Sequence, residues 1–139
     1  MRVFVDTNVL IDVIAKRKPF YADSATIWTL AEQGQVTGVA AAISFTNIYY
    51  IVRRLEDTKK ARRALHLLRD TFEVATCDQP VINQAIEAPI KDFEDAVQYV
   101  SALRSRADCL VSRNPSHFPT ADACPVLTPA EFLSAYHQP

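Results

Sequence analysis

The chain has 139 residues, a length that suits one domain with a substantial hydrophobic core. Its net charge of −1 gives no overall basic character that would indicate nucleic-acid binding, and its three cysteines form no close pair that would indicate disulfides or zinc. No stretch is apolar enough to cross a membrane, and a strand pattern at the first residues leaves no room for a signal peptide. We therefore expect one cytoplasmic domain over residues 1–139.

Short apolar strands alternate with amphipathic helices in the first half of the chain. A strand at residues 2–5 is followed by a helix over 9–14, and a helix over 22–33 that Gly34 can end precedes a strand at 36–42. Ser44 and Asp57 are candidate N-caps of two further helices, because both side chains can accept hydrogen bonds from free backbone amides. The second of these helices covers 59–69, and a strand at 72–76 follows it.

The second half continues the alternation. Asp78 can cap a helix that carries Pro80 in its first turn, and a longer helix over 94–106 leads to a strand at 108–112. A short strand at 125–127 precedes a capping box at 128–131, which begins a last helix. Strands separated by helices predict an α/β fold with three layers, α/β/α, in which helices flank a mostly parallel sheet of four to five strands.

Asp6 directly follows the first strand. That strand is apolar on both faces, as is typical of the centre of a parallel sheet. Ligands of open α/β sheets bind beyond the carboxyl ends of such strands, so Asp6 and the nearby Asn8 are candidate site residues. Asp is also a good N-cap, and capping the next helix would account for Asp6 without any chemistry. Both interpretations stay open on this segment alone.

Two further groups of polar residues could meet Asp6 at the same edge of the sheet. Asp92 and Asp95 begin the helix predicted over 94–106 and are spaced to share one face of its first turn, although helix capping would also explain them. Ser112 and Asn114 follow the strand at 108–112. Converging carboxylates repel one another and raise one another's pKa unless a cation neutralises them. Oxygen ligands favour Mg²⁺ or Mn²⁺ for that role.

Three segments in this order and spacing resemble the PIN-domain family of metal-dependent ribonucleases. They are Val-Asp-Thr-Asn-Val-Leu-Ile-Asp at 5–12, Asp-Phe-Glu-Asp-Ala at 92–96 and Leu-Val-Ser-Arg-Asn-Pro-Ser-His-Phe at 110–118. The likeness covers essentially the whole chain. The chain is also similar in size to VapC-type toxins. The resemblance implies an endoribonuclease that requires Mg²⁺ or Mn²⁺ and cleaves RNA. It also implies a homodimer and a small antitoxin that blocks the site.

The resemblance also assigns roles to single residues. It implies that Asp6, Asp92 and Asp95 bind the metal and act in catalysis together with Asn114, while Asn8, Asn47 and Ser112 support them. The family's second and fourth acids would fall at Asn47 and Asn114. An amide can bind Mg²⁺ through its carbonyl oxygen but supplies no charge, so we expect a weaker metal site than in most of the family.

RNA contacts would come from local basic residues, since the net charge offers none. The candidates are Lys16, Arg17, Lys18, Arg53 and Arg113. By contrast, the basic helix over 59–69 is interpreted as a solvated surface, with Glu56 and Lys60 paired across one turn.

Several assignments keep an alternative. We interpret Asp12 mainly as a polar residue on its helix, with an outer-shell role as the alternative. We interpret His117 as a structural or solvated residue of a turn-like loop, with a direct role in catalysis or metal binding as the alternative. The chain could also be a non-catalytic protein of the PIN fold that binds RNA or protein through a charge-depleted site. A third hypothesis is a phosphatase with Asp6 as nucleophile, similar to haloacid-dehalogenase-like enzymes. Those enzymes carry the motif Asp-x-Asp after the first strand, whereas position 8 here is Asn. They also need a lysine later in the chain, for which there is no clear candidate.

Overall fold

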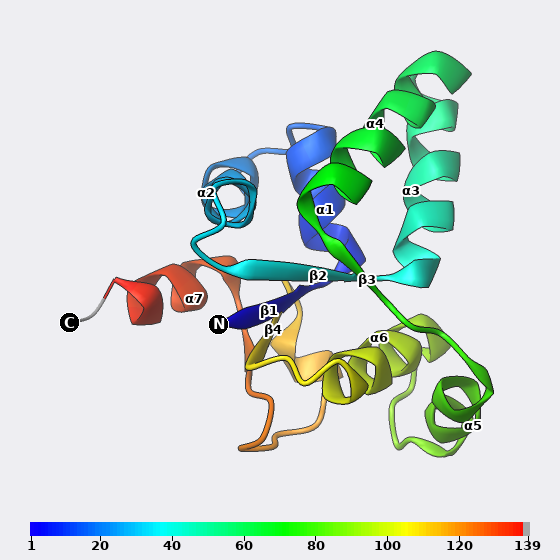
Figure 1. Ribbon diagram of the computed structural model, residues 1–139, viewed down its shortest axis with the longest axis vertical. Helices are drawn as coiled ribbons and strands as arrows, with labels where there is room; N and C mark the ends of the chain where they lie inside the picture. The colour runs from blue at the N-terminus through cyan, green and yellow to red at the C-terminus, as the bar shows by residue number, and fades with distance from the viewer. Residues whose placement is uncertain (138–139) are drawn as a thin grey trace.

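The structure is a computed structural model that describes residues 1–137. Five parallel strands form one sheet in the order β3-β2-β1-β4-β5, with helices on both faces (Figure 1). The strands are β1 (Arg2–Val5), β2 (Thr37–Ala41), β3 (Glu73–Ala75), β4 (Cys109–Val111) and β5 (Val126–Leu127). The helices are α1 (Thr7–Ile14), α2 (Tyr21–Glu32), α3 (Ala42–Leu55), α4 (Thr58–Thr71), α5 (Gln79–Glu87), α6 (Phe93–Arg104) and α7 (Pro129–Tyr136), with a 3-10 turn η1 at Pro115–His117. The predicted α/β fold with a parallel sheet is confirmed.

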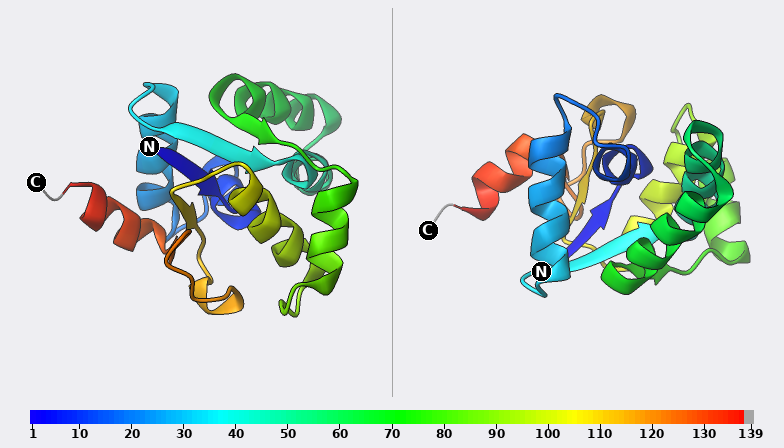
Figure 2. Two further views of the ribbon diagram at one scale, coloured as in Figure 1. Left: turned by 60° about the horizontal axis from the view of Figure 1, so that its bottom comes forward. Right: turned by 90° about the horizontal axis from the view of Figure 1, so that it is seen from above.

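The central strand β1 supplies side chains to both faces of the sheet, and those of Val3, Phe4 and Val5 are buried. Val3 and Val5 join a core under α1 to α4, to which Phe132 of α7 also belongs. Phe4 joins a second core on the opposite face, where α6 packs and α5 lies outside it (Figure 2). A strand that is apolar at successive positions can therefore sit only between two helical layers.

The predicted helix caps are present with one exception. Asp57, Asp78 and Asp92 each accept a hydrogen bond from the backbone amide three residues later, and the capping box that Thr128 begins is complete. The prediction that Ser44 caps α3 is wrong. Strand β2 passes into α3 without a loop, so Ala41 occupies the N-cap position and Ser44 lies buried inside the helix.

The chain order creates a crevice beside β1. After β1 the chain moves to β2 and β3, and it then returns through α5 and α6 to place β4 on the other side of β1 (Figure 1). Open α/β sheets bind ligands at such a reversal, beyond the carboxyl ends of the strands. Val5 pairs with Val111, so the residues that follow them, Asp6 and Ser112, lie side by side at this point.

None of the helices within residues 1–137 combines the length and the hydropathy that crossing a bilayer requires.

Candidate functional site

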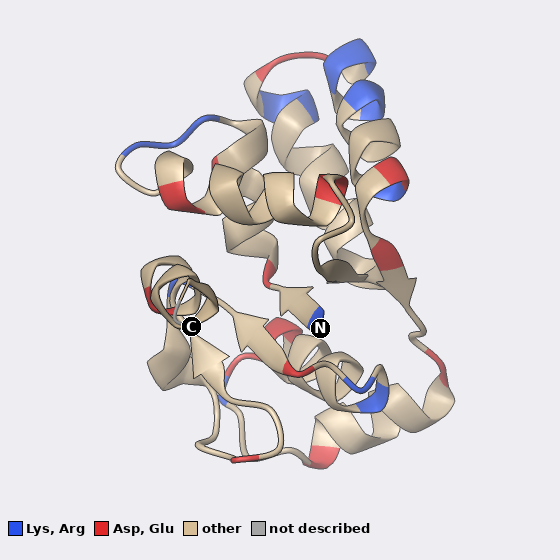
Figure 3. Cartoon of the chain, turned by 60° about the vertical axis from the view of Figure 1, so that its left-hand side comes forward, with Lys and Arg blue, Asp and Glu red and all other residues tan. Residues whose placement is uncertain are grey.

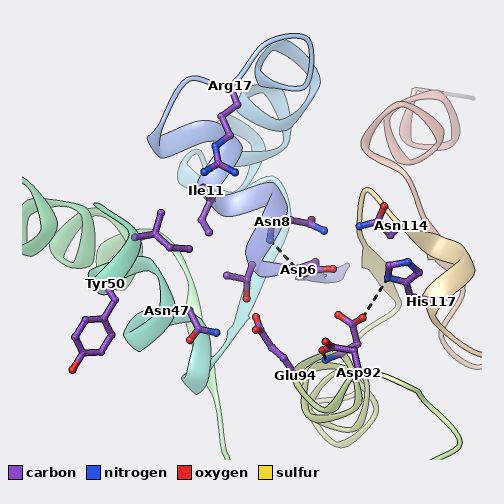
Figure 4. A pocket seen from close by; sticks show the side chains of 13 residues that line it. Asp6, Asn8, Ile11, Arg17, Asn47, Tyr50, Asp92, Glu94, Asn114 and His117 are labelled. Atoms are coloured by element: carbon purple, nitrogen blue, oxygen red, sulfur yellow. Dashed lines mark hydrogen bonds and ion pairs between the residues drawn. The ribbon is translucent and has the colours of Figure 1, made fainter. Parts of the chain in front are cut away.

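A cleft of about 490 Å³ opens at the carboxyl ends of the central strands (Figure 4). Its walls come from α1, α3, the start of α6 and the loop after β4. The residues that line it are Asp6, Thr7, Asn8, Ile11, Arg17, Asn47, Tyr50, Ile51, Asp92, Glu94, Asp95, Asn114 and His117. Segments up to 111 positions apart in the sequence, from Asp6 to His117, thus meet at one place, as the parallel topology requires.

Asp6 lies at the base of the cleft, and its side chain is only 3% exposed. Its Oδ1 accepts hydrogen bonds from the Asn8 amide at 3.3 Å and from Gln98 Nε2 at 3.0 Å. Its Oδ2 accepts a hydrogen bond from Ser112 Oγ at 2.7 Å. Asp6 therefore caps α1, as the simpler interpretation proposed, and at the same time presents a fixed carboxylate to the cleft.

Gln98 connects Asp6 to the neighbouring helices, and sequence reasoning missed it. Its side chain is buried on α6, and its Oε1 accepts from the Thr7 amide at 3.0 Å while its Nε2 donates to Asp6. The hydroxyls of Thr7 and Ser44 lie 2.6 Å apart and extend this network to α3. The sequence held one signal: Gln98 interrupts the apolar run of residues 96–100, three positions after Asp95.

The acids at the start of α6 face Asp6. Asp92 caps this helix, since its Oδ1 accepts from the Asp95 amide at 3.0 Å. Burial, reinforced by repulsion from Asp6 and Asp92, raises the pKa of Asp95 to about 6. His117 Nδ1 lies 3.4 Å from Asp95 Oδ2 and partly offsets that rise. Each carboxylate of the cleft thus disfavours the ionisation of its neighbours, as expected of acids that lack an internal cation.

Glu94 is a fourth acid of the cleft, and the sequence analysis did not name it. Burial raises its pKa, and the nearby Asn47 side chain works in the opposite direction. Glu94 adds a carboxylate to a site that the amides at Asn47 and Asn114 had predicted to be poor in charge. Its position next to Asp95 in the first turn of α6 was the only signal.

The donors of the cleft fit a hard cation that keeps part of its water shell. They are carboxylate and amide oxygens, the ligands that Mg²⁺ and Mn²⁺ prefer. Across residues 1–137, no three side chains of His, Cys, Asp or Glu approach closely enough to form a ready-made metal cluster. Mg²⁺ commonly binds through only one or two carboxylates and several waters, so an open arrangement of this kind still suits it.

The sequence pattern of the PIN domain matches residues 2–116. The chain belongs to the PIN-domain family. The ribonuclease VapC1 of Aquifex aeolicus (strain VF5) is 25% identical over 141 residues, which cover 98% of this chain and 96% of that protein. This PIN domain is therefore similar to a VapC ribonuclease along its whole length.

Solved structures show the same fold. A toxin-antitoxin complex from Klebsiella pneumoniae matches with a TM-score of 0.67 at 21% identity, over 91% of this chain and 97% of that one. VapBC-1 from nontypeable Haemophilus influenzae matches with a TM-score of 0.67 at 18% identity, over 94% of this chain and 99% of that one. At these identities the likeness establishes the PIN fold alone.

The structure brings together most of the residues predicted for the PIN-domain site. Asp6, Asp92, Asp95, Asn8, Asn47 and Asn114 line the cleft. Ser112 is buried beneath them, where its Oγ accepts a hydrogen bond from the Asn114 amide at 3.0 Å.

Asp12 and Arg113 form an ion pair beside the cleft. Asp12 is completely buried, and Arg113 Nε lies 2.7 Å from its Oδ2. The Arg113 guanidinium also lies 4.3 Å from the centre of the Phe20 ring. Asp12 lies on its predicted helix, but its complete burial and its pairing with Arg113 were not predicted; α1 turns this position toward the loop after β4. Burial raises the Asp12 pKa, and Arg113 and then Arg17 oppose that rise.

The other basic candidates lie nearer the outside of the cleft. Arg17 lines the cleft wall, with Lys16 and Lys18 beside it in the α1–α2 loop. The Arg53 guanidinium lies 5.1 Å from the centre of the Tyr50 ring, which also lines the wall. Figure 3 shows that the basic residues of the α1–α2 loop and of the α3–α4 end gather at the same end of the molecule.

Proposed function

We propose that this PIN-domain protein is a Mg²⁺- or Mn²⁺-dependent endoribonuclease that hydrolyses RNA phosphodiester bonds, and that it is the toxin of a toxin–antitoxin pair. The observation that carries the proposal is the buried carboxylate of Asp6, which faces the acids of α6 across one open cleft. The similarity to a VapC ribonuclease over the full chain supports the same activity.

Asp6, Asp92 and Asp95 would hold the cation. A divalent ion bound there supplies an activated water and stabilises negative charge at the reacting phosphorus. Gln98 and Ser112 keep the Asp6 carboxylate oriented, since each donates a hydrogen bond to one of its oxygens. The amides of Asn8 and Asn114 offer neutral donors and acceptors that can orient a water or a phosphate oxygen at the cleft.

RNA would approach over the basic wall of the cleft. Among the cleft-lining residues that the structure describes, Arg17 is the only arginine or lysine. Its guanidinium can contact a phosphate next to the bond that is cleaved. The described residues that line the cleft include no lysine, so the lysine that the phosphatase hypothesis needs is not found there.

We further propose that a small antitoxin protein blocks the cleft. The support is that proteins of the same fold have been crystallised as toxin–antitoxin complexes. The homodimer implied by the family resemblance stays a prediction, which light scattering of the purified chain would test.

RNA cleavage by the purified chain tests the proposal. We expect cleavage with Mg²⁺ or Mn²⁺, none with EDTA, and a loss of at least about a hundredfold in Asp6→Asn and Asp95→Asn. Asp70→Asn, an exposed acid on α4, should match the wild type. RNA binding without cleavage, unchanged by the chelator, would instead support the non-catalytic alternative.

A further inference from the structure

Glu94 and Asn47 face each other across the cleft. Glu94 lies in the first turn of α6, and its side chain points toward Asn47 on α3 (Figure 4). The two side chains line the same cleft, and Glu94 is half-buried rather than extended into solvent. A glutamate that served only to stabilise the helix terminus would not need to face another helix across the cleft.

The chemistry of the pair fixes the role of each member. A carboxylate can only accept hydrogen bonds, whereas an amide carries two N–H donors. An Asn47 N–H that donates to Glu94 would restrict the orientation of this carboxylate. The acid next to it on α6, Asp95, lies near His117 on the other side of the cleft. Two consecutive acids of one helix thus place their carboxylates in different parts of the site.

The wall that α3 contributes has no acid of its own. Helix α3 contains no Asp or Glu at any of its positions, and its side chains in the cleft are those of Asn47, Tyr50 and Ile51. Any negative charge on this side of the cleft must come from another element. Glu94 and Asp6 line the same cleft, so their carboxylates face the same region of space.

We propose that Glu94, oriented by Asn47, is the carboxylate that completes the cation site on the α3 side of the cleft. This inference rests on the proposed function, because it assigns one more residue to the same metal. Asn47 is a positioning residue in this account, since it acts through Glu94. The amide at position 47 is then a working part of the site and not a sign of lost activity.

Two measurements test the inference. One is a calorimetric titration of Mn²⁺ alone into the purified chain, and the other is an RNA cleavage assay. We expect Glu94→Gln to weaken Mn²⁺ binding by at least about tenfold and to slow cleavage by a similar factor. Asn47→Ala should weaken Mn²⁺ binding less, because the charge remains and only its orientation is lost. Glu87→Gln, the same change at an exposed position of α5, is the matched control.

An exchange of the two side chains gives the sharper result. The double variant Glu94→Gln/Asn47→Glu places a carboxylate on α3 and an amide on α6, and it should recover most of the Mn²⁺ affinity that Glu94→Gln loses. Thermal unfolding without metal shows whether each variant is folded. If Glu94→Gln does not fold, the Mn²⁺ affinity of a folded double variant still tests the inference.

Two outcomes separate this inference from the proposed function. If the wild type binds Mn²⁺ and cleaves RNA while Glu94→Gln matches it, the role of Glu94 is refuted and the ribonuclease proposal stands. If the wild type neither binds Mn²⁺ nor cleaves RNA, the proposed function itself fails. A double variant no better than Glu94→Gln would also contradict the inference.

Discussion

One buried aspartate caps the first helix of this protein and another lies within it, and the two have opposite surroundings. Asp12 is 0% exposed and is neutralised inside the protein by Arg113. Asp6 is 3% exposed, receives hydrogen bonds only from neutral groups, and faces further acids. Burial alone therefore does not separate a structural carboxylate from a functional one. The two kinds of carboxylate differ in the source of the compensating positive charge. Asp12 has an internal cation in Arg113, whereas the acids of the cleft around Asp6 need a cation from outside.

The largest effect should come from removing the internal cation. Arg113→Met would leave Asp12 buried without a partner, and we expect the free energy of unfolding to fall by about 3 to 5 kcal/mol. Urea denaturation measures this loss. The double variant Asp12→Asn/Arg113→Met should regain most of it, because no buried charge remains. A loss below about 1 kcal/mol in the single variant would contradict the comparison, since exposed pairs have that size.

A smaller effect should follow from loosening Asp6 without changing its charge. Gln98→Met keeps the length of the side chain and removes the donor to Asp6 Oδ1. We expect RNA cleavage and Mn²⁺ affinity to fall by about 10- to 100-fold, as for other groups that orient a metal ligand. Gln84→Met, at an exposed position of α5, is the matched control. Unchanged Mn²⁺ affinity in Gln98→Met would show that this network does not position Asp6.

The smallest effect concerns pH. Burial is the main cause that raises the pKa of Asp95 to about 6 in the folded chain, whereas its value in the unfolded chain is about 4. Between pH 4 and pH 6 the Asp95 carboxyl is therefore protonated in the folded chain and ionised in the unfolded chain. Without metal, this group lowers stability as pH rises from 4 to 6 and has no further effect above 6. Asp95→Asn should therefore be more stable than the wild type at pH 7 by about 1 to 2 kcal/mol, with screening included, and nearly equal to it at pH 4.

Thermal unfolding in EDTA across this pH range checks the difference between the two proteins. A difference that does not change with pH would mean that Asp95 is not under electrostatic strain. Mn²⁺ at pH 7 should stabilise the wild type and leave Asp95→Asn almost unchanged.

Much of the fold could be predicted because its signals are local. The apolar run at β1, the caps Asp57, Asp78 and Asp92, and the capping box at Thr128 each depend on neighbours in the sequence. The parallel topology then brings Asp6 and the start of α6 to one edge. This is why the main acids of the cleft could be named before the structure was known.

The residues that were missed depend on tertiary geometry. Gln98 is recognisable only once α6 is seen to pass behind Asp6, and Glu94 only once its side chain is seen to turn toward α3. The burial of Asp12 and its partner were not predicted, because the direction of one helix position relative to the loop after β4 cannot be obtained from periodicity alone. In each case the sequence shows the polar residue but not its partner.

A crystal soaked in Mn²⁺ tests most directly whether the acids of the cleft await an external cation. The account predicts an anomalous peak in the cleft, coordinated by Asp6 together with carboxylates of α6, and no peak beside Asp12. A crystal that holds no Mn²⁺ near Asp6, or binds it only elsewhere, would contradict the central claim.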